Sequence, residues 1–309
     1  MAEITQFIFF DFEMLCSNRG MDYNDMEAIR LGAVKYDLAT KTVSYFDQYI
    51  KPRSNKPLSA FCKRLTGITD DQLADAATFP AVLEEFLTWV GGIKRSRFFS
   101  WSKSDMSRLE IDSKSWGIPD GTLKKIKQRY VDFQDVFTKR VSKENMSVEN
   151  ALALYDLTFV GIKHNPMFDA YNTLCIYLQF LNQPEVTDRI MIKQFILQKE
   201  MDPVEMNATL KEILEQDTTS FFKDLQEVTN IIQAKKTLKK LRRIVTKYNN
   251  ILHNRSGMFT QKVIQHVKLL VIIYDGLMQT YDEHLKYRSK TMYIDEHLYY
   301  PIKKLAIAN

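Results

Sequence analysis

Short apolar runs alternate with helical periodicity along the first 183 residues of the chain. Residues 7–12 are almost entirely apolar or aromatic, which is typical of a strand that is buried on both faces. Residues 28–37 and 42–50 form two further strand patterns, and the brief polar stretch LATK between them predicts an antiparallel pair. Residues 97–101 and 129–133 are predicted as the fourth and fifth strands.

Segments with helical spacing lie between and after these strands. Residues 81–90 repeat apolar side chains at helical intervals, and Ser104 is expected to cap a helix that follows the fourth strand. Residues 147–155 and 166–181 are predicted as two more helices. Three strands in a meander, followed by strand–helix–strand–helix, predict an α/β layer arrangement.

The pattern changes after the stretch NQPE at residues 182–185. Long segments with a 3.6-residue period cover approximately residues 188–200, 203–216, 219–253 and 258–289. Residues 184–309 are therefore predicted to form a second, mainly α-helical domain. Within it, residues 267–278 are apolar nearly all round, which predicts either a central helix or an oligomer contact.

Composition restricts the class of protein. The chain has 309 residues, enough for two ordinary domains, and its 45% hydrophobic and 26% charged content is typical of a soluble globular protein. No run approaches the roughly 18 consecutive apolar residues of a membrane span, and MAEITQF lacks the pattern of a secretory signal. Three scattered Cys without CxxC spacing predict reduced thiols and a cytoplasmic protein, rather than disulfides or a zinc site.

Charge is divided unequally between the two halves. Residues 1–183 contain 23 basic and 23 acidic side chains, whereas residues 184–309 contain 20 basic and 15 acidic ones. The excess is consistent with contact to an anion such as nucleic acid, and equally with a basic solvated surface. The most basic segment contributes six candidates for a nucleic-acid contact: Lys235, Lys236, Lys239, Lys240, Arg242 and Arg243.

Two carboxylates follow the apolar core of the first strand. Asp11 and Glu13 are two positions apart, so on a strand their side chains point to the same face. Two anions that close repel each other, and a divalent cation such as Mg²⁺ between them would remove the repulsion. An isolated pair is equally consistent with a Glu13 that already lies in a solvated turn.

More candidate chemistry lies beyond the later strands. Asp105 follows the fourth strand, and His164 precedes Asp169 by five residues. Asn165 is a good N-cap and Pro166 suits the first helical position, so Asp169 is expected one turn inside a helix and His164 on the loop before it. An imidazole would then lie beside a carboxylate near a positive helix N-terminus. Three other acidic residues are predicted to be surface or cap residues: Asp112, Asp132 and Asp135.

The order DFE, then a lone Asp in a SW…D…L context, then HxxxxD at the start of a helix resembles one enzyme family. It is similar to the DEDDh branch of the DnaQ-like 3′–5′ exonucleases, with an Eri-like or KapD-type character, over about residues 4–183. EAIRLGAVKYD is similar to the second strand of that family, although Arg30 stands where many relatives carry Glu. The resemblance implies an α/β fold, an RNase H-like mixed five-stranded sheet flanked by helices. It does not extend to the mainly α-helical domain of residues 184–309.

The resemblance also implies a reaction and the residues that perform it. The expected activity is hydrolysis of phosphodiester bonds at single-stranded 3′ ends of RNA or DNA, with release of 5′-mononucleotides and two Mg²⁺ or Mn²⁺ ions per site. The implied catalytic residues are four metal-binding carboxylates and a histidine as general base: Asp11, Glu13, Asp105, Asp169 and His164. The implied substrate contacts, by stacking against the terminal base or through the backbone, are Phe12, Met14 and Leu15.

Two alternatives remain open for the chain as a whole. The helical domain could make the protein a nucleic-acid or protein-binding scaffold with a vestigial nuclease half. It could also recruit an active nuclease half to a ribonucleoprotein or defence complex, through a protein partner or self-association. Intact acidic and histidine positions disfavour the vestigial reading, since an inactive site has no need of all five.

Overall fold

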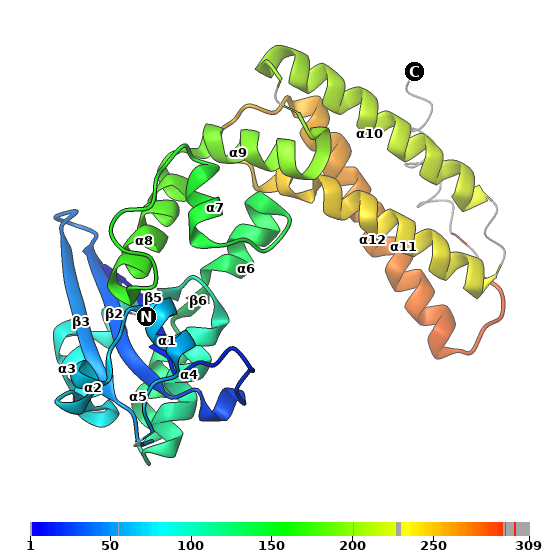
Figure 1. The fold of residues 1–309 in the computed structure, drawn as a ribbon. Coiled ribbons are helices and arrows are strands. Elements are labelled where there is room, and N and C mark those ends of the chain that lie inside the picture. The colour runs from blue at the N-terminus through cyan, green and yellow to red at the C-terminus, as the bar shows by residue number, and fades with distance from the viewer. Residues whose placement is uncertain are drawn as a thin grey trace. The chain divides into compact units, whose positions relative to one another are not determined.

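The computed structural model describes residues 2–54, 56–199, 201–226, 230–292, 294 and 300. The chain divides into two compact units, an N-terminal unit of residues 1–139 and 144–182 and a C-terminal unit of residues 140–143 and 183–309 (Figure 1). The boundary predicted after residue 183 lies one residue from this division, and the grouping of residues 140–143 with the C-terminal unit was not predicted. Residues 301–309 of the predicted helical domain lie outside the described residues.

A mixed sheet of six strands forms the centre of the N-terminal unit, in the order β4-β3-β2-β1-β5-β6. The strands are β1 (Gln6–Met14), β2 (Ala28–Asp37), β3 (Val43–Lys51), β4 (Ala77–Thr78), β5 (Ser96–Ser100) and β6 (Tyr130–Asp132). β1, β2 and β3 pair antiparallel as predicted, while β4, β5 and β6 join the sheet in parallel pairs. The predicted count of five strands omitted β4, because two residues are too short to show a period.

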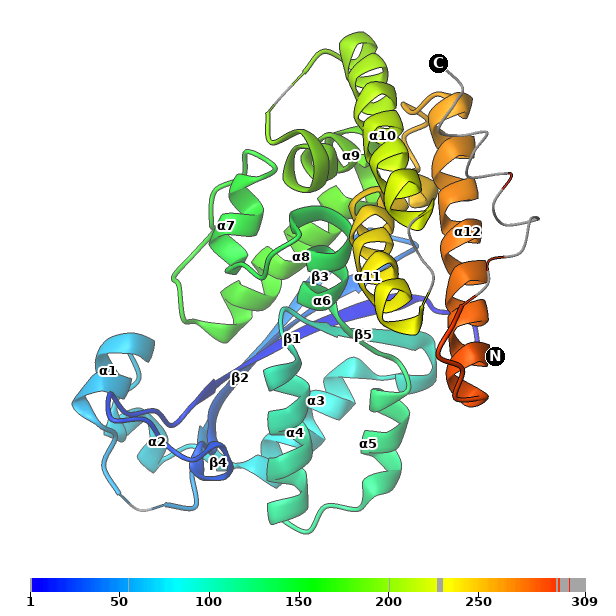
Figure 2. The same cartoon turned by 90° about the vertical axis from the view of Figure 1, so that its right-hand side faces the viewer.

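Helices cover both faces of this sheet, which explains why β1 is apolar on both sides. On one face, Ile8 and Phe10 lie in a core with α3 (Phe79–Val90), α4 (Lys103–Ser115) and α5 (Asp120–Lys127). On the other face, the ring of Phe9 stacks on Phe99 at 4.7 Å and meets Tyr177 of α8 (Pro166–Asn182) at 5.5 Å. Figure 2 shows α8 on one side of the sheet and α3, α4 and α5 on the other.

The helix starts follow the capping residues, with one correction. The remaining helices of this unit are α1 (Ala60–Thr66), α2 (Asp70–Ala74), α6 (Phe133–Phe137) and α7 (Val148–Ala153). Ser147 caps α7, where its side chain accepts a backbone N–H of the first turn. The expected cap of α4 at Ser104 is wrong: Ser102 has the extended backbone of a cap residue and accepts the Ser104 N–H, so the helix starts at Lys103.

The C-terminal unit is helical, as predicted, but its helices break elsewhere. Its helices are α9 (Pro184–Ile192), α10 (Pro203–Gln226), α11 (Ile231–Tyr248) and α12 (Gln261–Lys286). The expected break near residues 217–218 is wrong, because α10 is continuous through them. Within this helix the Thr218 hydroxyl donates to the Leu214 carbonyl at 2.7 Å. The single helix expected over residues 219–253 is therefore two helices, and Asn230 caps the second.

Three of these helices, α10, α11 and α12, lie side by side (Figures 1 and 2). They share a core that includes Leu210, Leu241 and Leu270, each at most 1% exposed. Val267 and Ile273 also lie in this core, whereas Ile272 is 54% exposed, so one side of the apolar segment of α12 packs inside the unit. Within the described part of the chain, no helix is long and apolar enough to cross a membrane.

Candidate metal centre

The end of β1 places two carboxylates on one face of the sheet. Asp11 pairs with Gly32 and Glu13 pairs with Arg30 of β2, and the register shifts only after Glu13. Glu13 is therefore still part of the strand and is not in a solvated turn. Alternate residues of a strand share a face, so Asp11 and Glu13 lie on the same face as Phe9. Since Phe9 meets Tyr177 of α8, both carboxylates point toward α8.

Asp169 reaches this face because α8 approaches β2 closely at Gly32. A Cβ atom on Gly32 would lie 1.9 Å from the Met167 backbone nitrogen, so any other residue would push the helix away. The Asn165 side chain accepts the Met167 N–H at 3.1 Å and caps α8, as predicted. The cap and the close approach together place Asp169 in the first turn of α8, beside β1.

Four carboxylates gather at this point. Ligand oxygens of Asp11, Glu13 and Asp169 all lie within 4.8 Å of one another. Asp105, in the first turn of α4, is 3% exposed, accepts the Phe12 N–H at 3.2 Å and is hydrogen-bonded to Asp11. The structure thus brings the four predicted carboxylates together, with Asp105 attached to one side of the other three.

Burial and mutual repulsion oppose the ionisation of these groups. Loss of hydration is the largest cause in each case, and it raises the pKa of Glu13 to about 8 and those of Asp105 and Asp169 to about 7. The pKa of Asp11 is raised well above its ordinary value by burial and then by the charges of its three neighbours. A divalent cation would remove this repulsion, and carboxylate oxygens are the donors that Mg²⁺ and Mn²⁺ prefer, so the site fits such ions.

One cation of the chain already lies beside the cluster. Arg30 lies across from Glu13 in the β1–β2 register and lowers the pKa of that carboxyl. Its guanidinium binds Asp47 through two hydrogen bonds of 2.7 and 2.6 Å and lies 4.7 Å from the ring centroid of Tyr49. The pKa of Glu13 nevertheless stays near 8, so Arg30 offsets only part of the repulsion.

His164 lies in the turn just before α8, as predicted. The residue is exposed, has a left-handed backbone with φ of 59°, and donates its backbone N–H to the Asp169 carboxylate. This bond lowers the pKa of Asp169 and connects the loop to the cluster. The role of the imidazole as a general base stays a prediction.

Asn172 supports this loop and was not found from the sequence. Its fully buried amide accepts the Val160 N–H at 3.0 Å and donates to the carbonyls of Val160 and Phe168 at 2.9 and 2.8 Å. The two bonds to Val160 attach the chain that leads to His164 to α8, and the bond to Phe168 lies within the helix. A polar amide on the inward face of a helix, three residues after Asp169, was the signal available in the sequence.

The prediction that Asp112 is a surface or cap residue is wrong. Asp112 is 3% exposed, binds fully buried Arg108 at 2.8 Å and accepts the Ala28 N–H at 2.9 Å. Arg108 also donates to the Tyr23 carbonyl, so the pair joins α4 to the loop between β1 and β2. Since α4 carries Asp105, this buried pair helps to position the cluster. Two predictions of this kind agree with the structure, the cap residue Asp132 and the exposed Asp135.

The predicted substrate contacts divide into two groups. The ring of Phe12 is 4% exposed and packs in the core beside Phe10, so the expected stacking on a base is wrong for this side chain. Met14 and Leu15 are partly exposed, and their contact with substrate stays a prediction. Trp101 is a core residue whose indole N–H donates to the Met146 carbonyl at 2.9 Å.

The six basic candidates of the second domain also divide. Five lie exposed along α11: Lys235, Lys236, Lys239, Arg242 and Arg243. Lys240 instead binds Asp224 of α10 at 2.5 Å and Ser220 at 3.0 Å, so its ammonium group serves the packing of two helices. A nucleic-acid contact by these residues stays a prediction, and Lys240 is the weakest candidate for it.

Comparison with known proteins adds to this geometry. The family model described as RNase_T, Exonuclease, matches residues 8–177. This chain belongs to that exonuclease family. Exonucleases of the family depend on metal ions, and the acidic cluster supplies ligands of the kind that such ions require. The predicted superfamily is thereby confirmed.

The individual relatives each cover a little more than half of the chain. ERI1 exoribonuclease 2 from Danio rerio is 26% identical over 54% of this chain and 33% of its own length. The 3′-5′ exonuclease crn-4 from Caenorhabditis elegans is 25% identical over 56% of this chain and 61% of its own length. The solved nuclease domain of 3′hExo, a DEDDh family member bound to rAMP, superimposes with a TM-score of 0.53, 23% identity, and coverage of 59% of this chain and 95% of that domain. The RNase H-like fold is therefore confirmed, and the matched region spans less than two thirds of either curated relative.

Proposed function

We propose that this chain is a metal-dependent 3′–5′ exonuclease that acts on single-stranded 3′ ends and releases 5′-mononucleotides. The observation that carries the proposal is the convergence of four carboxylates from β1, α4 and α8 on one point. Relatives named as an exoribonuclease and a 3′-5′ exonuclease support the direction of the reaction and favour RNA as the first substrate to test.

The acidic cluster would hold two Mg²⁺ or Mn²⁺ ions. The residues that would hold the ions are Asp11, Glu13, Asp169 and Asp105, and the charge of Asp11 interacts with those of the other three. Four carboxylates balance the charge of two divalent ions. When bound, the ions would activate a water molecule and stabilise the leaving oxygen.

His164 would take the proton from the attacking water. An imidazole changes its charge near neutral pH, which suits a general base. The exposed position of His164 leaves its ring accessible, while its backbone bond to Asp169 keeps the loop at the cluster. Asn172 would be a positioning residue for this loop, because its amide on α8 binds the backbone of Val160 in the segment that leads to His164.

The test uses single-stranded RNA and DNA that carry a label at the 5′ end. With Mn²⁺ or Mg²⁺ we expect a ladder of products shortened from the 3′ end, and with EDTA we expect none. Asp11→Ala and His164→Ala should remove the ladder while the protein stays folded. Asp120→Ala, which removes an exposed carboxylate of α5, should have no effect. Full activity in a pure Asp11→Ala preparation would contradict the proposal.

Other proposals concern the chain as a whole. No observation favours a scaffold with an inactive site, because all five implied catalytic positions are occupied by the required residue types. The three free thiols support a reducing compartment such as the cytoplasm. A partner protein or self-association through the C-terminal unit remains a separate proposal.

A further inference from the structure

Helix α11 has a strongly basic surface. The helix contains seven Lys and Arg residues and no Asp or Glu. Five of them are exposed and form what we call the basic face: Lys235, Lys236, Lys239, Arg242 and Arg243. Within the residues that the structure describes, none of the five takes part in an ion pair.

The basic face occupies one side of the helix. Its members recur at intervals of three and four residues, so they lie in two adjoining rows along the same surface. From Lys235 to Arg243 the helix rises about 12 Å, which is enough for several phosphates of a strand rather than one ion. The opposite side of α11 is apolar and lies in the core through Leu238, Leu241 and Val245.

The packing of the unit does not account for these charges. The two lysines of α11 that do pair, Lys240 and Lys247, bind Asp224 and Asp217 of α10 at 2.5 and 2.9 Å. The basic face has no such partner within the described residues, and like charges three and four positions apart destabilise a helix. None of its five residues lies in the last turn, where the helix dipole would favour a cation. Stability therefore gives no reason for the basic face.

We propose that the basic face of α11 binds the phosphate backbone of a single-stranded nucleic acid, as a site separate from the metal centre. The proposal rests on the proposed function in one respect, namely that the bound polymer is the class of molecule the enzyme would degrade. Five cations without an ionic partner among the described residues, on a helix that has no anion, complement a polyanion without regard to base sequence.

Other occupants fit the surface less well. A helix that lies on a membrane combines cations with a broad apolar face turned to the lipid. Here the apolar face of α11 is buried in the core, and Ile232, which is 69% exposed, is an isolated apolar side chain beside the basic face. A segment of an acidic protein would meet the same cations, and the experiment below separates it from RNA by competition.

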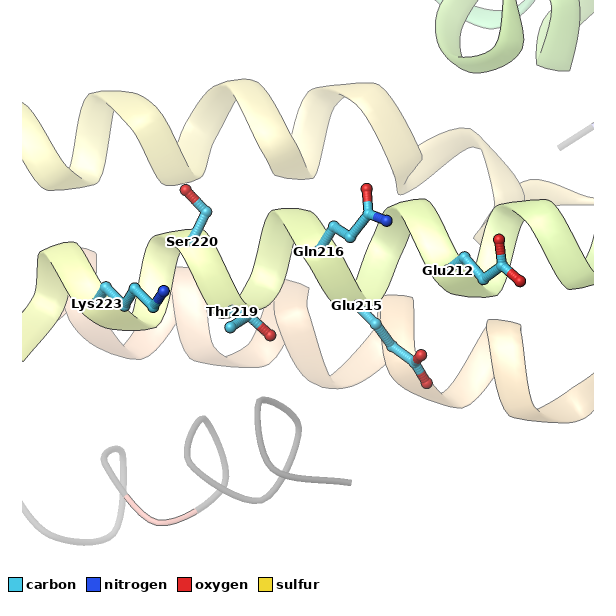
Figure 3. Close-up of a pocket in the computed structure, with 6 residues that line it drawn as sticks. All are labelled: Glu212, Glu215, Gln216, Thr219, Ser220 and Lys223. Atoms are coloured by element: carbon cyan, nitrogen blue, oxygen red, sulfur yellow. The ribbon is translucent and has the colours of Figure 1, made fainter. Parts of the chain in front are cut away.

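A hollow along α10 offers no comparable site. It encloses about 480 Å³ and is lined by Glu212, Glu215, Gln216, Thr219, Ser220 and Lys223. Figure 3 shows that all six side chains come from this one helix, with Gln216 and Ser220 directed to one side and Glu215 and Thr219 to the other. Side chains that diverge from one helix and carry opposite charges do not define a ligand.

The test measures RNA binding by the whole 309-residue chain in EDTA, so that the strand is not degraded and the metal centre stays empty. The probe is a fluorescein-labelled single-stranded RNA of about 20 nucleotides, followed by anisotropy between about 50 and 200 mM KCl. The variant is the triple substitution Lys235→Gln, Lys239→Gln and Arg242→Gln. The control is Lys124→Gln, Lys125→Gln and Lys127→Gln on α5, which removes the same charge from three exposed lysines.

We expect the α11 variant to bind at least about tenfold more weakly at low salt and to reduce the slope of log K against log salt by about 2, as the loss of three phosphate contacts on a single strand predicts. The control should keep the slope of the unmodified protein. Circular dichroism should show equal helix content in all three proteins, because the substituted side chains are exposed.

Three results would overturn the proposal. These are an unchanged slope in the α11 variant, an equal loss in the α5 control, and displacement of RNA by poly-glutamate as readily as by unlabelled RNA. A failure of the proposed function would look different. In that case no mononucleotide is released with Mn²⁺, while the binding difference between the two triple variants is intact.

Discussion

At the residue scale, the four carboxyl groups of the acidic cluster repel one another when they ionise without a bound cation. Their ordinary pKa values lie near 4, whereas the fold raises that of Glu13 to about 8 and those of Asp105 and Asp169 to about 7. A raised carboxyl pKa means that the native state keeps protons which the unfolded chain releases. The metal-free protein therefore loses stability as the pH rises from about 4 to about 8.

Asp11→Asn should raise the melting temperature of the metal-free protein at about pH 8, because it removes one of four carboxyl groups that repel one another when ionised. The gain should be smaller at about pH 5, where the unmodified cluster keeps most of its protons. Each kcal/mol of relieved repulsion corresponds to roughly 2–4 °C for a protein of this size. Differential scanning fluorimetry in EDTA measures both values.

The same experiment with Mn²⁺ should reverse the order. Mn²⁺ should stabilise the unmodified protein clearly and the Asp11→Asn variant much less, because the substitution removes a ligand. If the variant is less stable than the unmodified protein in EDTA at about pH 8, the cluster is not under electrostatic strain.

At the element scale, the site depends on how closely α8 and α4 approach β1. Gly32 of β2 lets the first turn of α8 come into contact with the sheet backbone, which places Asp169 beside Asp11. The buried pair of Arg108 and Asp112 attaches α4 and its Asp105 to the loop after β1. Neither contact involves a residue that would touch a metal ion or a substrate.

Gly32→Ala should lower the exonuclease rate by about 100-fold, because its Cβ would lie 1.9 Å from the Met167 nitrogen and would displace α8 from the sheet. Overpacking of this kind should also cost about 1–3 kcal/mol of folding free energy. Rates of 3′-end shortening and urea denaturation curves give the two quantities.

Gly121→Ala is the matched control, since no atom lies within 4 Å of a Cβ atom added there on α5. It should leave the rate unchanged and the stability unchanged or slightly higher. An equal loss of rate in both variants would show that the close approach at Gly32 has no special role.

At the scale of the whole molecule, two units with separate cores carry the two proposed activities. The N-terminal unit contains the acidic cluster, and the C-terminal unit contains the basic face on helices that pack around their own apolar core. Charge follows nearly the same division, since the formal excess of five positive charges lies in residues 184–309. Each proposed site can therefore be altered without change to the core of the other unit.

Mn²⁺ should slow amide hydrogen exchange in peptides from β1, α4 and α8, because these elements carry the ligands. Peptides from α10, α11 and α12 should exchange at the same rate with and without the ion. Hydrogen–deuterium exchange with mass spectrometry measures this, and Asp11→Asn should show no protection anywhere. Protection within α11 would contradict the independence of the two units.

The sequence by itself determined the strands, the class of fold and the carboxylates of the site. These features depend on local periods: alternation places Asp11 and Glu13 on one face, and the cap at Asn165 places Asp169 in a first turn. Ordered motifs then indicated the family. β4 was missed because two residues carry no period, and the break before α11 was misplaced because α10 continues through the polar residues 217–219.

Only the tertiary structure decided which residues that are distant in the chain come into contact. It buried the ring of Phe12, paired Asp112 with Arg108, assigned Lys240 to α10 and left the basic face of α11 without ionic partners among the described residues. It also gave Gly32 and Asn172 their roles beneath the acidic cluster. Such contacts depend on the distance between packed elements, and the spacing of residues along one chain does not encode that distance.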